Sequence, residues 1–231
     1  MYLVLRVENC SVEIDGNPIL QHVNLQAGPG EILALVGHNG AGKSTLMKTM
    51  IGMRGKLSGL IKIQQESMDD HLKNYKRLFS YIPEEPLLFS ELTTRQHFDL
   101  YRRSYSIDED IFATRVDRYM DAFEITDKKD DYPEALSKGM RQKVQTICAL
   151  LPDVPVLFID EPFMGLDVYA GQYLEEELIR RKEQGITIIL TTHQLDKVKA
   201  LADTYVMLKN GSVSSSGPVE SFERLERREH K

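Results

Sequence analysis

A glycine-rich segment between an apolar run and a predicted helix constrains the fold of this chain more than any other feature. Residues 31–36 read Glu-Ile-Leu-Ala-Leu-Val, which is typical of a strand buried on both faces of a parallel sheet. The pattern Gly37-x-x-x-x-Gly42-Lys43-Ser44 follows, and residues 43–51 are predicted to form a helix. Glycines let consecutive backbone N–H groups turn inward without a Cβ clash, and the helix start adds the positive end of its dipole. The segment therefore predicts a loop that wraps phosphate groups.

The loop also predicts which side chains meet a nucleotide. Lys43 can reach the β- and γ-phosphates, Ser44 can ligate Mg²⁺, and Thr45 offers a hydroxyl beside the α-phosphate. A chance match to the pattern is disfavoured, because the strand and the helix that the loop requires are both predicted at its ends. The predicted ATP-binding residues of this loop are Gly37, His38, Asn39, Gly40, Ala41, Gly42, Lys43, Ser44 and Thr45.

Two adjacent acids end a second apolar run. Residues 154–159 are predicted to form a buried strand, and Asp160 and Glu161 follow it. The carboxyl end of a strand is where an α/β sheet places its chemistry. Acids at strand ends are often only turn residues, but phosphoryl transfer needs Mg²⁺ and therefore carboxylates. Beside the phosphate loop, we expect Asp160 to hold Mg²⁺ and Glu161 to take a proton from the attacking water.

The remaining pattern predicts an α/β fold: a P-loop core with a mostly parallel sheet, an antiparallel N-terminal part and a helical insert. We expect one domain over residues 1–231, with the ATP-binding core in 1–85 and 137–231 and the helical subdomain in 86–136. Further strands are predicted at 3–7, 11–14, 19–26, 186–191, 204–208 and 212–215, and further helices within 93–123 and at 137–151, 168–183, 194–201 and 222–231.

Composition disfavours some classes of function. The 231 residues carry a net charge of -6, and a protein that binds nucleic acid needs an excess of Lys and Arg to neutralise phosphates. The chain is therefore a poor candidate for nucleic-acid binding, although net charge does not exclude a local basic patch. No apolar run approaches the ~20 residues of a membrane helix, so at a membrane another chain must span the bilayer. Cys10 and Cys148 lie in no metal-binding or redox spacing and are expected to be reduced thiols.

Three further motifs lie in a fixed order around the acids. Leu136-Ser137-Lys138-Gly139-Met140 precedes them, Gly165-Leu166-Asp167 follows, and His193 ends a Thr-Thr-His run. Together with the phosphate loop, these motifs resemble those of the nucleotide-binding domains of ATP-binding cassette (ABC) proteins over essentially the whole chain. In that comparison residues 136–140 correspond to the family's signature, 165–167 to its D-loop, and His193 to its switch histidine.

The resemblance implies that two such domains pair head to tail, with each ATP between the phosphate loop of one and the signature of the other. Ser137 and the N–H of Gly139 would then contact the ATP held by the partner, at the positive end of a helix dipole. By the same resemblance Glu161 is the catalytic base and His193 contacts the γ-phosphate. ATP joins the two halves and hydrolysis releases them.

The chain departs from the family at three places. Ile14 stands where an aromatic side chain often stacks on adenine, so we expect Ile14 to cover the base with weaker base discrimination and an affinity leaning toward millimolar. Glu84 stands where a Gln usually contacts Mg²⁺; we expect Glu84 to ligate the metal and to act in catalysis. Lys138 and Met140 replace a Gly and a Gln of the signature, and Lys138 either adds positive charge beside the phosphate or is a solvated surface residue.

The predicted function is that of the ATPase subunit of an ABC transporter at the inner face of the cell membrane. Its expected partners are an integral-membrane permease and a second ABC domain, identical or not, and no nucleic acid. The signature variant and Pro83-Glu84-Glu85 resemble exporter-type subunits, including peptide-antibiotic and lantibiotic-immunity exporters. Residues 87–89 either form part of a groove for the permease or simply cap the core.

Two other functions are less well supported by the sequence. A soluble ABC protein that acts on ribosomes or DNA usually carries two cassettes or a long coiled-coil insert, and neither fits within 231 residues. An unrelated P-loop kinase or GTPase is disfavoured by the signature and by His193.

Overall fold

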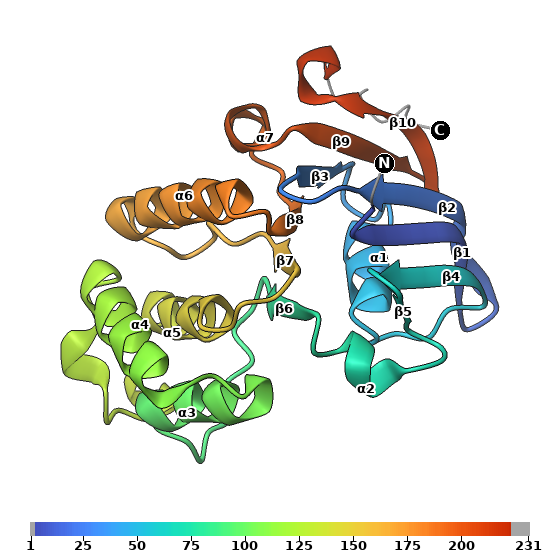
Figure 1. The fold of residues 1–231 in the computed structure, drawn as a ribbon. Helices are drawn as coiled ribbons and strands as arrows, with labels where there is room; N and C mark the ends of the chain where they lie inside the picture. The colour runs from blue at the N-terminus through green and yellow to red at the C-terminus, as the bar shows by residue number, and fades with distance from the viewer. Residues whose placement is uncertain (1–2, 223–231) are drawn as a thin grey trace.

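The computed structural model describes residues 3–222, so all but the first residue of the helix predicted at 222–231 lies outside the described part. The structure contains a six-stranded sheet in the order β10-β9-β3-β8-β7-β6 and a four-stranded sheet in the order β2-β1-β4-β5 (Figure 1). In the larger sheet only β10 is antiparallel to its neighbour. Its strands are β3 (Ile32–Val36), β6 (Phe79–Ile82), β7 (Val156–Asp160), β8 (Thr187–Thr191), β9 (Thr204–Lys209) and β10 (Ser212–Pro218). The predicted α/β class and mostly parallel sheet are confirmed.

The larger sheet separates two hydrophobic cores. Every residue of β3, β7 and β8 is buried, as their continuous apolar runs predict. Ile32, Ala34 and Val36 face the first core, whereas Leu33 and Leu35 face the second. Since side chains alternate along a strand, each of these short strands contributes to both cores.

Helices cover the two faces unequally (Figure 1). The first core contains side chains of α3 (Thr94–Tyr105), α4 (Glu109–Ala122), α5 (Lys138–Leu150), α6 (Val168–Glu183) and α7 (Leu195–Leu201). The second core contains side chains of α1 (Lys43–Met50), α2 (Leu72–Tyr75) and the smaller sheet. Helices α1 and α5 therefore lie on opposite faces of the larger sheet. This separation matters for the site, because each helix begins at one of the predicted nucleotide-contacting motifs.

The smaller sheet is antiparallel, as predicted, but its first strand corrects a boundary. The strands are β1 (Leu5–Ile14), β2 (Asn17–Ala27), β4 (Ser58–Ile63) and β5 (Glu66–Ser67). Two strands at 3–7 and 11–14 were expected, whereas β1 is one strand that continues through a bulge. Asn9 adopts a left-handed φ of 47°, and the register with β2 shifts between Val7 and Cys10. The polar residues that suggested a turn therefore mark an irregularity within a paired strand.

The segment between β6 and α5 is helical and closes on itself. Thr93 caps α3 with a capping box. The Asp108 carboxylate caps α4 by accepting hydrogen bonds from the backbone N–H groups of Asp110 and Ile111. The segment closes where the N–H of Thr94 donates to the carbonyl of Asp131 at 2.9 Å.

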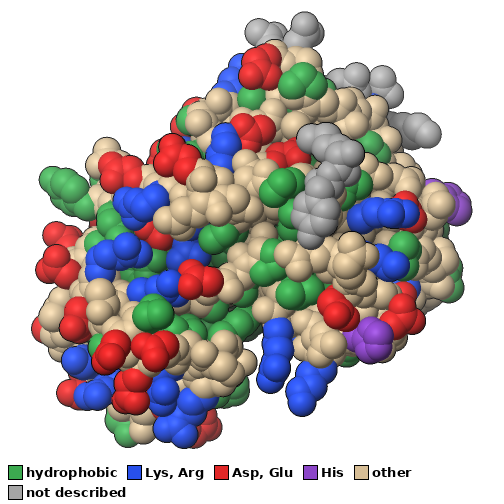
Figure 2. Space-filling view, in the orientation of Figure 1, with side chains coloured by type: hydrophobic (Ala, Val, Ile, Leu, Met, Phe, Trp, Pro, Cys, Tyr) green, Lys and Arg blue, Asp and Glu red, His purple; other side chains and the backbone are tan. Residues whose placement is uncertain are grey.

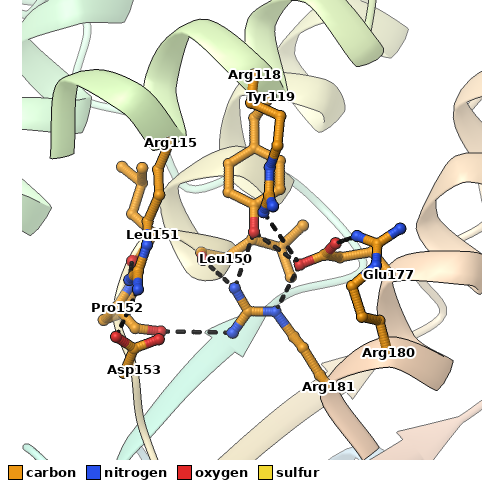
Figure 3. Close-up of polar contacts among 10 residues, drawn as sticks. All are labelled: Arg115, Arg118, Tyr119, Leu150, Leu151, Pro152, Asp153, Glu177, Arg180 and Arg181. Carbon is orange, nitrogen blue, oxygen red and sulfur yellow. Dashed lines mark hydrogen bonds and ion pairs between the residues drawn. The ribbon is translucent and has the colours of Figure 1, made fainter. Parts of the chain in front are cut away.

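A buried charged cluster joins α4, α5 and α6 (Figure 3). Glu177, almost fully buried, accepts from the Tyr119 hydroxyl at 2.7 Å and from Arg181 Nε at 3.0 Å. Arg181 also donates to the carbonyl of Leu150, the last residue of α5. A guanidinium at a helix C-terminus satisfies carbonyls that have no partner within the helix. The cluster thus fixes the C-terminal end of α5 to α6.

Candidate nucleotide-binding site

The glycine-rich loop lies between β3 and α1, as predicted. Gly37, Gly40 and Gly42 have positive φ angles of 151°, 80° and 107°. A Cβ at Gly37 would lie 2.5 Å from the carbonyl oxygen of Leu208, and a Cβ at Gly42 would lie 2.6 Å from a methyl carbon of Leu20. At Gly37 both the backbone conformation and the nearby Leu208 backbone exclude other residues, whereas at Gly40 and Gly42 the positive φ disfavours them. The loop backbone therefore keeps the tight shape that phosphate binding requires.

Lys43 lies at the centre of the predicted site. Its ammonium donates to the carbonyl of Gly37 at 2.7 Å and contacts that of His38 at 3.3 Å. Burial lowers the pKa of Lys43, and the nearby carboxylates of Glu161, Asp160 and Glu84 oppose that shift. Residues from three separate segments of the sequence thus converge on one cation.

Asp160 ends β7 with its carboxylate buried. The hydroxyl of Thr191, the last residue of β8, donates to Asp160 Oδ1. Burial raises the pKa of Asp160, and the Thr191 hydrogen bond and the cations of Lys48 and Lys43 counteract the rise. The sequence alone assigns Thr191 no role, since its local signal is a hydroxyl at the end of an apolar strand, two residues before His193.

Mg²⁺ fits this donor set. Within residues 3–222 no group of three or more His, Cys, Asp and Glu side chains converges as a metal site. Mg²⁺ with a nucleotide needs only one or two carboxylates, because phosphates and water supply its other oxygens. The Asp160 carboxylate is buried beside Lys43, and the exposed Ser44 follows Lys43 at the start of α1.

Glu161 and His193 are in direct contact. His193 Nδ1 lies 3.0 Å from Glu161 Oε2, and the His193 backbone N–H donates to the same oxygen at 3.3 Å. Glu161 follows β7 with a left-handed φ of 47°, and its own N–H donates to the Thr191 carbonyl at 3.1 Å. The side chain of Glu161 is only 11% exposed, whereas that of His193 is 57% exposed. A non-glycine residue in this conformation is held there by its surroundings.

The two variant positions lie at the edges of this site. Glu84 is exposed just after β6, within electrostatic reach of Lys43. Ile14 ends β1 and is half-buried against the second core. The hairpin that carries Ile14 continues into Leu20, which lies against Gly42. The hairpin is therefore adjacent to the glycine-rich loop.

The signature residues lie elsewhere. Ser137 caps α5 by accepting from the N–H of Met140 at 3.2 Å, and Gly139 is in the first turn. Because α5 and α1 lie on opposite faces of the larger sheet, the structure does not join Ser137 and Gly139 to the chain's own glycine-rich loop (Figure 1). Lys138 is exposed and forms an ion pair with Glu85 at 2.7 Å, an interaction that neither reading of Lys138 anticipated.

Comparison with known proteins agrees with this geometry. The sequence pattern of the family described as "ABC transporter" matches residues 20–164, well over half of the chain. The chain belongs to the ABC transporter family. It is an ATP-binding, ATP-hydrolysing subunit of the kind found in these transporters. No helix among residues 3–222 combines the length and apolar character needed to cross a bilayer.

Individual relatives cover nearly the whole chain. The ABC-type transporter ATP-binding protein EcsA of Bacillus subtilis (strain 168) is 33% identical over 95% of this chain and 89% of its own length. A solved structure of the ATP binding subunit of an ABC transporter superposes with a TM-score of 0.91 at 36% identity, covering 95% of this chain and 91% of that one. The ABC fold class is thus confirmed.

The names of two less similar relatives refer to the transport of different substrates. SkfE of Bacillus subtilis (strain 168), a SkfA peptide export ATP-binding protein, is 28% identical over 95% of this chain and 91% of its own length. MntB of Halalkalibacterium halodurans, a manganese transport system ATP-binding protein, is also 28% identical, over 94% of this chain and 86% of its own length.

Proposed function

We propose that this chain pairs with a second ABC domain, hydrolyses ATP at the composite site and thereby drives a separate integral-membrane permease that exports its substrate. One observation carries the proposal. Lys43, Asp160 and Glu161 converge at the glycine-rich loop, whereas Ser137 and Gly139 lie beyond the opposite face of the sheet. A single chain thus holds two separate halves of a nucleotide site, and a second domain is needed to bring such halves together.

Each residue has a proposed part in the chemistry. Residues 37–45 hold the ATP phosphates with backbone N–H groups and Lys43. Ser44, Asp160 and Glu84 would hold Mg²⁺, which would supply neutralisation of the phosphate charge. Glu161 takes the proton of the attacking water, and His193, already 3.0 Å from Glu161, contacts the γ-phosphate.

The helical segment has a proposed mechanical part. We assign residues 1–85 and 137–231 to the ATP-binding core and 86–136 to a helical subdomain. The hydrogen bonds that close this segment, from Thr94 to Asp131 and from Arg95 to Lys129, support the division. Such a segment can shift as a unit while the sheet that holds the nucleotide stays fixed.

A groove beside the helical segment supports the permease as partner. It has a volume of about 430 Å³ and lies between the α1–β6 region and α3. Phe89 lines it and is 57% exposed, Leu87 is 59% exposed, and Leu88 packs against the first core. The two interpretations of residues 87–89 therefore apply to different residues. Leu88 caps the core, and Phe89 offers an apolar contact to a helix of the permease.

The proposed direction of transport is based on motif variants rather than on overall sequence identity to relatives. A peptide-export protein and a manganese-transport protein are equally similar to this chain. Lys138 in the signature and Glu84 in the loop after β6 are the variants that resemble exporter-type subunits. We therefore propose export, with the chain at the inner face of the cell membrane and bound there through its permease.

The alternative of a partner such as ribosomal RNA or DNA finds less support. The net charge is -6, and the face shown in Figure 2 intersperses acidic and basic side chains without an extended basic surface. Nucleic-acid binding depends on such a surface.

Co-purification tests the proposed function. A tagged chain, expressed from its native locus and extracted in mild detergent, should bring down an integral-membrane protein, and addition of that protein should stimulate ATP hydrolysis. A chain with Phe89→Ser should retain its basal hydrolysis and lose the membrane partner. Ile111→Ser, which replaces an exposed apolar side chain on α4 outside the groove, serves as the matched control. Recovery of ribosomes or nucleic acid without a membrane protein would favour the alternative.

Base discrimination should be weak because Ile14 cannot stack as an aromatic ring does. Stacking on an aromatic side chain contributes ~1–3 kcal/mol per base. We expect GTP to compete with ATP at a dissociation constant within about five-fold, and Ile14→Tyr to raise ATP affinity by about ten-fold. Equilibrium titration of both nucleotides measures this. A native chain that already strongly prefers ATP would show that Ile14 does not limit base binding.

Glu84→Gln should alter the dependence of hydrolysis on Mg²⁺. If Glu84 ligates the metal, losing its charge should raise the Mg²⁺ concentration for half-maximal hydrolysis by about three- to ten-fold, since metal sites depend on ligand charge. Glu91→Gln, at an exposed carboxylate further along the same segment, is the control. Because Gln itself can contact Mg²⁺ at this position, Glu84→Ala completes the test, and an unchanged Mg²⁺ dependence in Glu84→Ala would remove Glu84 from the metal site.

A further inference from the structure

Lys138, the first residue of α5, is a cation at a position where a helix disfavours one. The helix begins at Lys138 directly after its cap residue Ser137, and its first turn contains no acidic side chain. The N–H groups at a helix start carry the positive end of the helix dipole, which repels a lysine and attracts an anion. A residue that opposes its local structure in this way needs an anion from elsewhere to compensate it.

The structure provides that anion from the loop after β6. Lys138 Nζ lies 2.7 Å from Glu85 Oε1, and the two side chains are 58% and 66% exposed. Water solvates both groups at such exposure, so an ion pair of this kind contributes little to stability and can break at small cost. Glu85 therefore compensates Lys138 without binding it firmly.

The loop that carries Glu85 does not depend on this ion pair for its position. Before Glu85, Gln142 Nε2 of α5 donates to the Pro83 carbonyl at 3.2 Å. After it, the Leu87 N–H donates to Gln145 Oε1 of α5 at 3.0 Å. Both glutamine side chains belong to buried residues, where a broken hydrogen bond is costly. The loop is thus fixed to α5 on both sides of Glu85, and the ion pair can break without releasing it.

A stronger anion would reach Lys138 when two chains pair. In the proposed function the ATP held by one chain meets Ser137 and Gly139 of the other, and Lys138 lies between these two residues in the sequence. A phosphate group carries up to about two negative charges and offers several acceptor oxygens, whereas a carboxylate carries a single charge. The terminal phosphate would therefore attract Lys138 more strongly than Glu85 does.

We propose that Lys138 exchanges partners: it pairs with Glu85 in the free chain and with the terminal phosphate of the other chain's ATP in the closed pair. The inference rests on the proposed function and adds one contact to it. Glu85 then competes with ATP for Lys138 and weakens the dimer. The two residues of this ion pair therefore have opposite effects on dimerisation, whereas an ion pair that only stabilises the fold gives the same effect from either side.

Dissociation constants of the ATP-bound dimer test the exchange. They are measured by analytical ultracentrifugation with ATP and Mg²⁺ on the full chain carrying Glu161→Gln. Lys138→Met should raise the constant by about ten-fold or more, because a charge-assisted contact is lost at both ATP sites. Glu85→Gln should lower it by about three-fold, as expected when an exposed competing ion pair is removed. The double variant should match Lys138→Met, because Glu85 acts only through Lys138.

Control variants keep the test specific to this pair. Lys138→Arg should stay within about three-fold of the parent chain, since a guanidinium also binds phosphate. Arg6→Met removes the cation of another exposed ion pair, with Glu8 at 2.6 Å, and should leave the dimer unchanged. The melting temperature should be unchanged in Glu85→Gln and unchanged or higher in Lys138→Met, because the repulsion by the helix dipole is removed.

The outcomes separate this inference from the proposed function. If Glu161→Gln alone forms no ATP-dependent dimer, the pairing of two such chains fails, and the inference fails with it. If that dimer forms but Lys138→Met does not weaken it, or Glu85→Gln does not strengthen it, only the exchange is overturned. A Glu85→Gln dimer that is as stable with ADP as with ATP would also overturn the exchange, since ADP lacks the terminal phosphate.

Discussion

Replacing Lys43 by Met should abolish ATP binding at ordinary concentrations while leaving the fold intact. Lys43 is the cation on which the carboxylates of Asp160, Glu161 and Glu84 converge, at the mouth of the glycine-rich loop. Charge-assisted hydrogen bonds contribute about 1.5–3 kcal/mol each, and an ammonium can donate to both the β- and γ-phosphates. We therefore expect the dissociation constant for ATP to rise by about 100-fold or more. Isothermal titration with ATP and Mg²⁺ measures this.

The expected effect on stability distinguishes this loss from unfolding. Burial lowers the pKa of Lys43, which means that the folded state disfavours its charged form. Met removes that charge and fills similar volume, so the melting temperature should be unchanged or higher. Lys56→Met is the matched control: Lys56 is 12% exposed and pairs with Asp69 at 2.8 Å, outside the loop. A Lys43→Met chain that binds ATP with native affinity would remove Lys43 from the phosphate site.

How far the sequence predicts the fold depends on burial. Strands β3, β7 and β8 are buried at every position, so their apolar runs alone identify them. Strand β4 at Ser58–Ile63 mixes exposed and buried residues and was not predicted. Strands β5 and β6 and helix α2 were not predicted either, because elements of two to four residues are too short to show a pattern. Strand β1 was divided in error, because its bulge at Asn9 resembles a turn until its pairing on both sides is known.

The parts of the candidate site that depend on consecutive residues could be predicted from the sequence, whereas contacts between distant residues could not. The glycine-rich loop is predictable because its requirements, φ above zero and space without a Cβ, act on consecutive residues. The hydrogen bond from Thr191 to Asp160 joins neighbouring strands whose residues are 31 apart in sequence, and no local pattern encodes that pairing. The ion pair between Lys143 and Asp167 likewise exists only because α5 packs beside the start of α6. Such contacts depend on the completed fold.

Replacing Glu161 by Gln should have the opposite effect to Lys43→Met: ATP should still bind, but hydrolysis should stop. Loss of a general base costs about 10²–10⁴-fold in rate, so kcat should fall at least 100-fold. Gln keeps the length of the side chain and can still contact His193, which lies 3.0 Å from Glu161 Oε2. The phosphate loop is untouched, and ATP affinity should stay within about three-fold, since no phosphate contact is removed.

The uncleaved ATP should then hold two chains together. In the proposed head-to-tail pair, bound ATP joins the glycine-rich loop of one chain to Ser137 and Gly139 of the other, and only hydrolysis releases them. Light scattering should report a dimer of Glu161→Gln with ATP and Mg²⁺ and a monomer with ADP, whereas native chain should return to monomer as ATP is consumed. Adding Lys43→Met should abolish the dimer because ATP no longer binds. A Glu161→Gln chain with native turnover would exclude Glu161 as the base, and normal ATP binding without a dimer would exclude the sandwich of two identical chains.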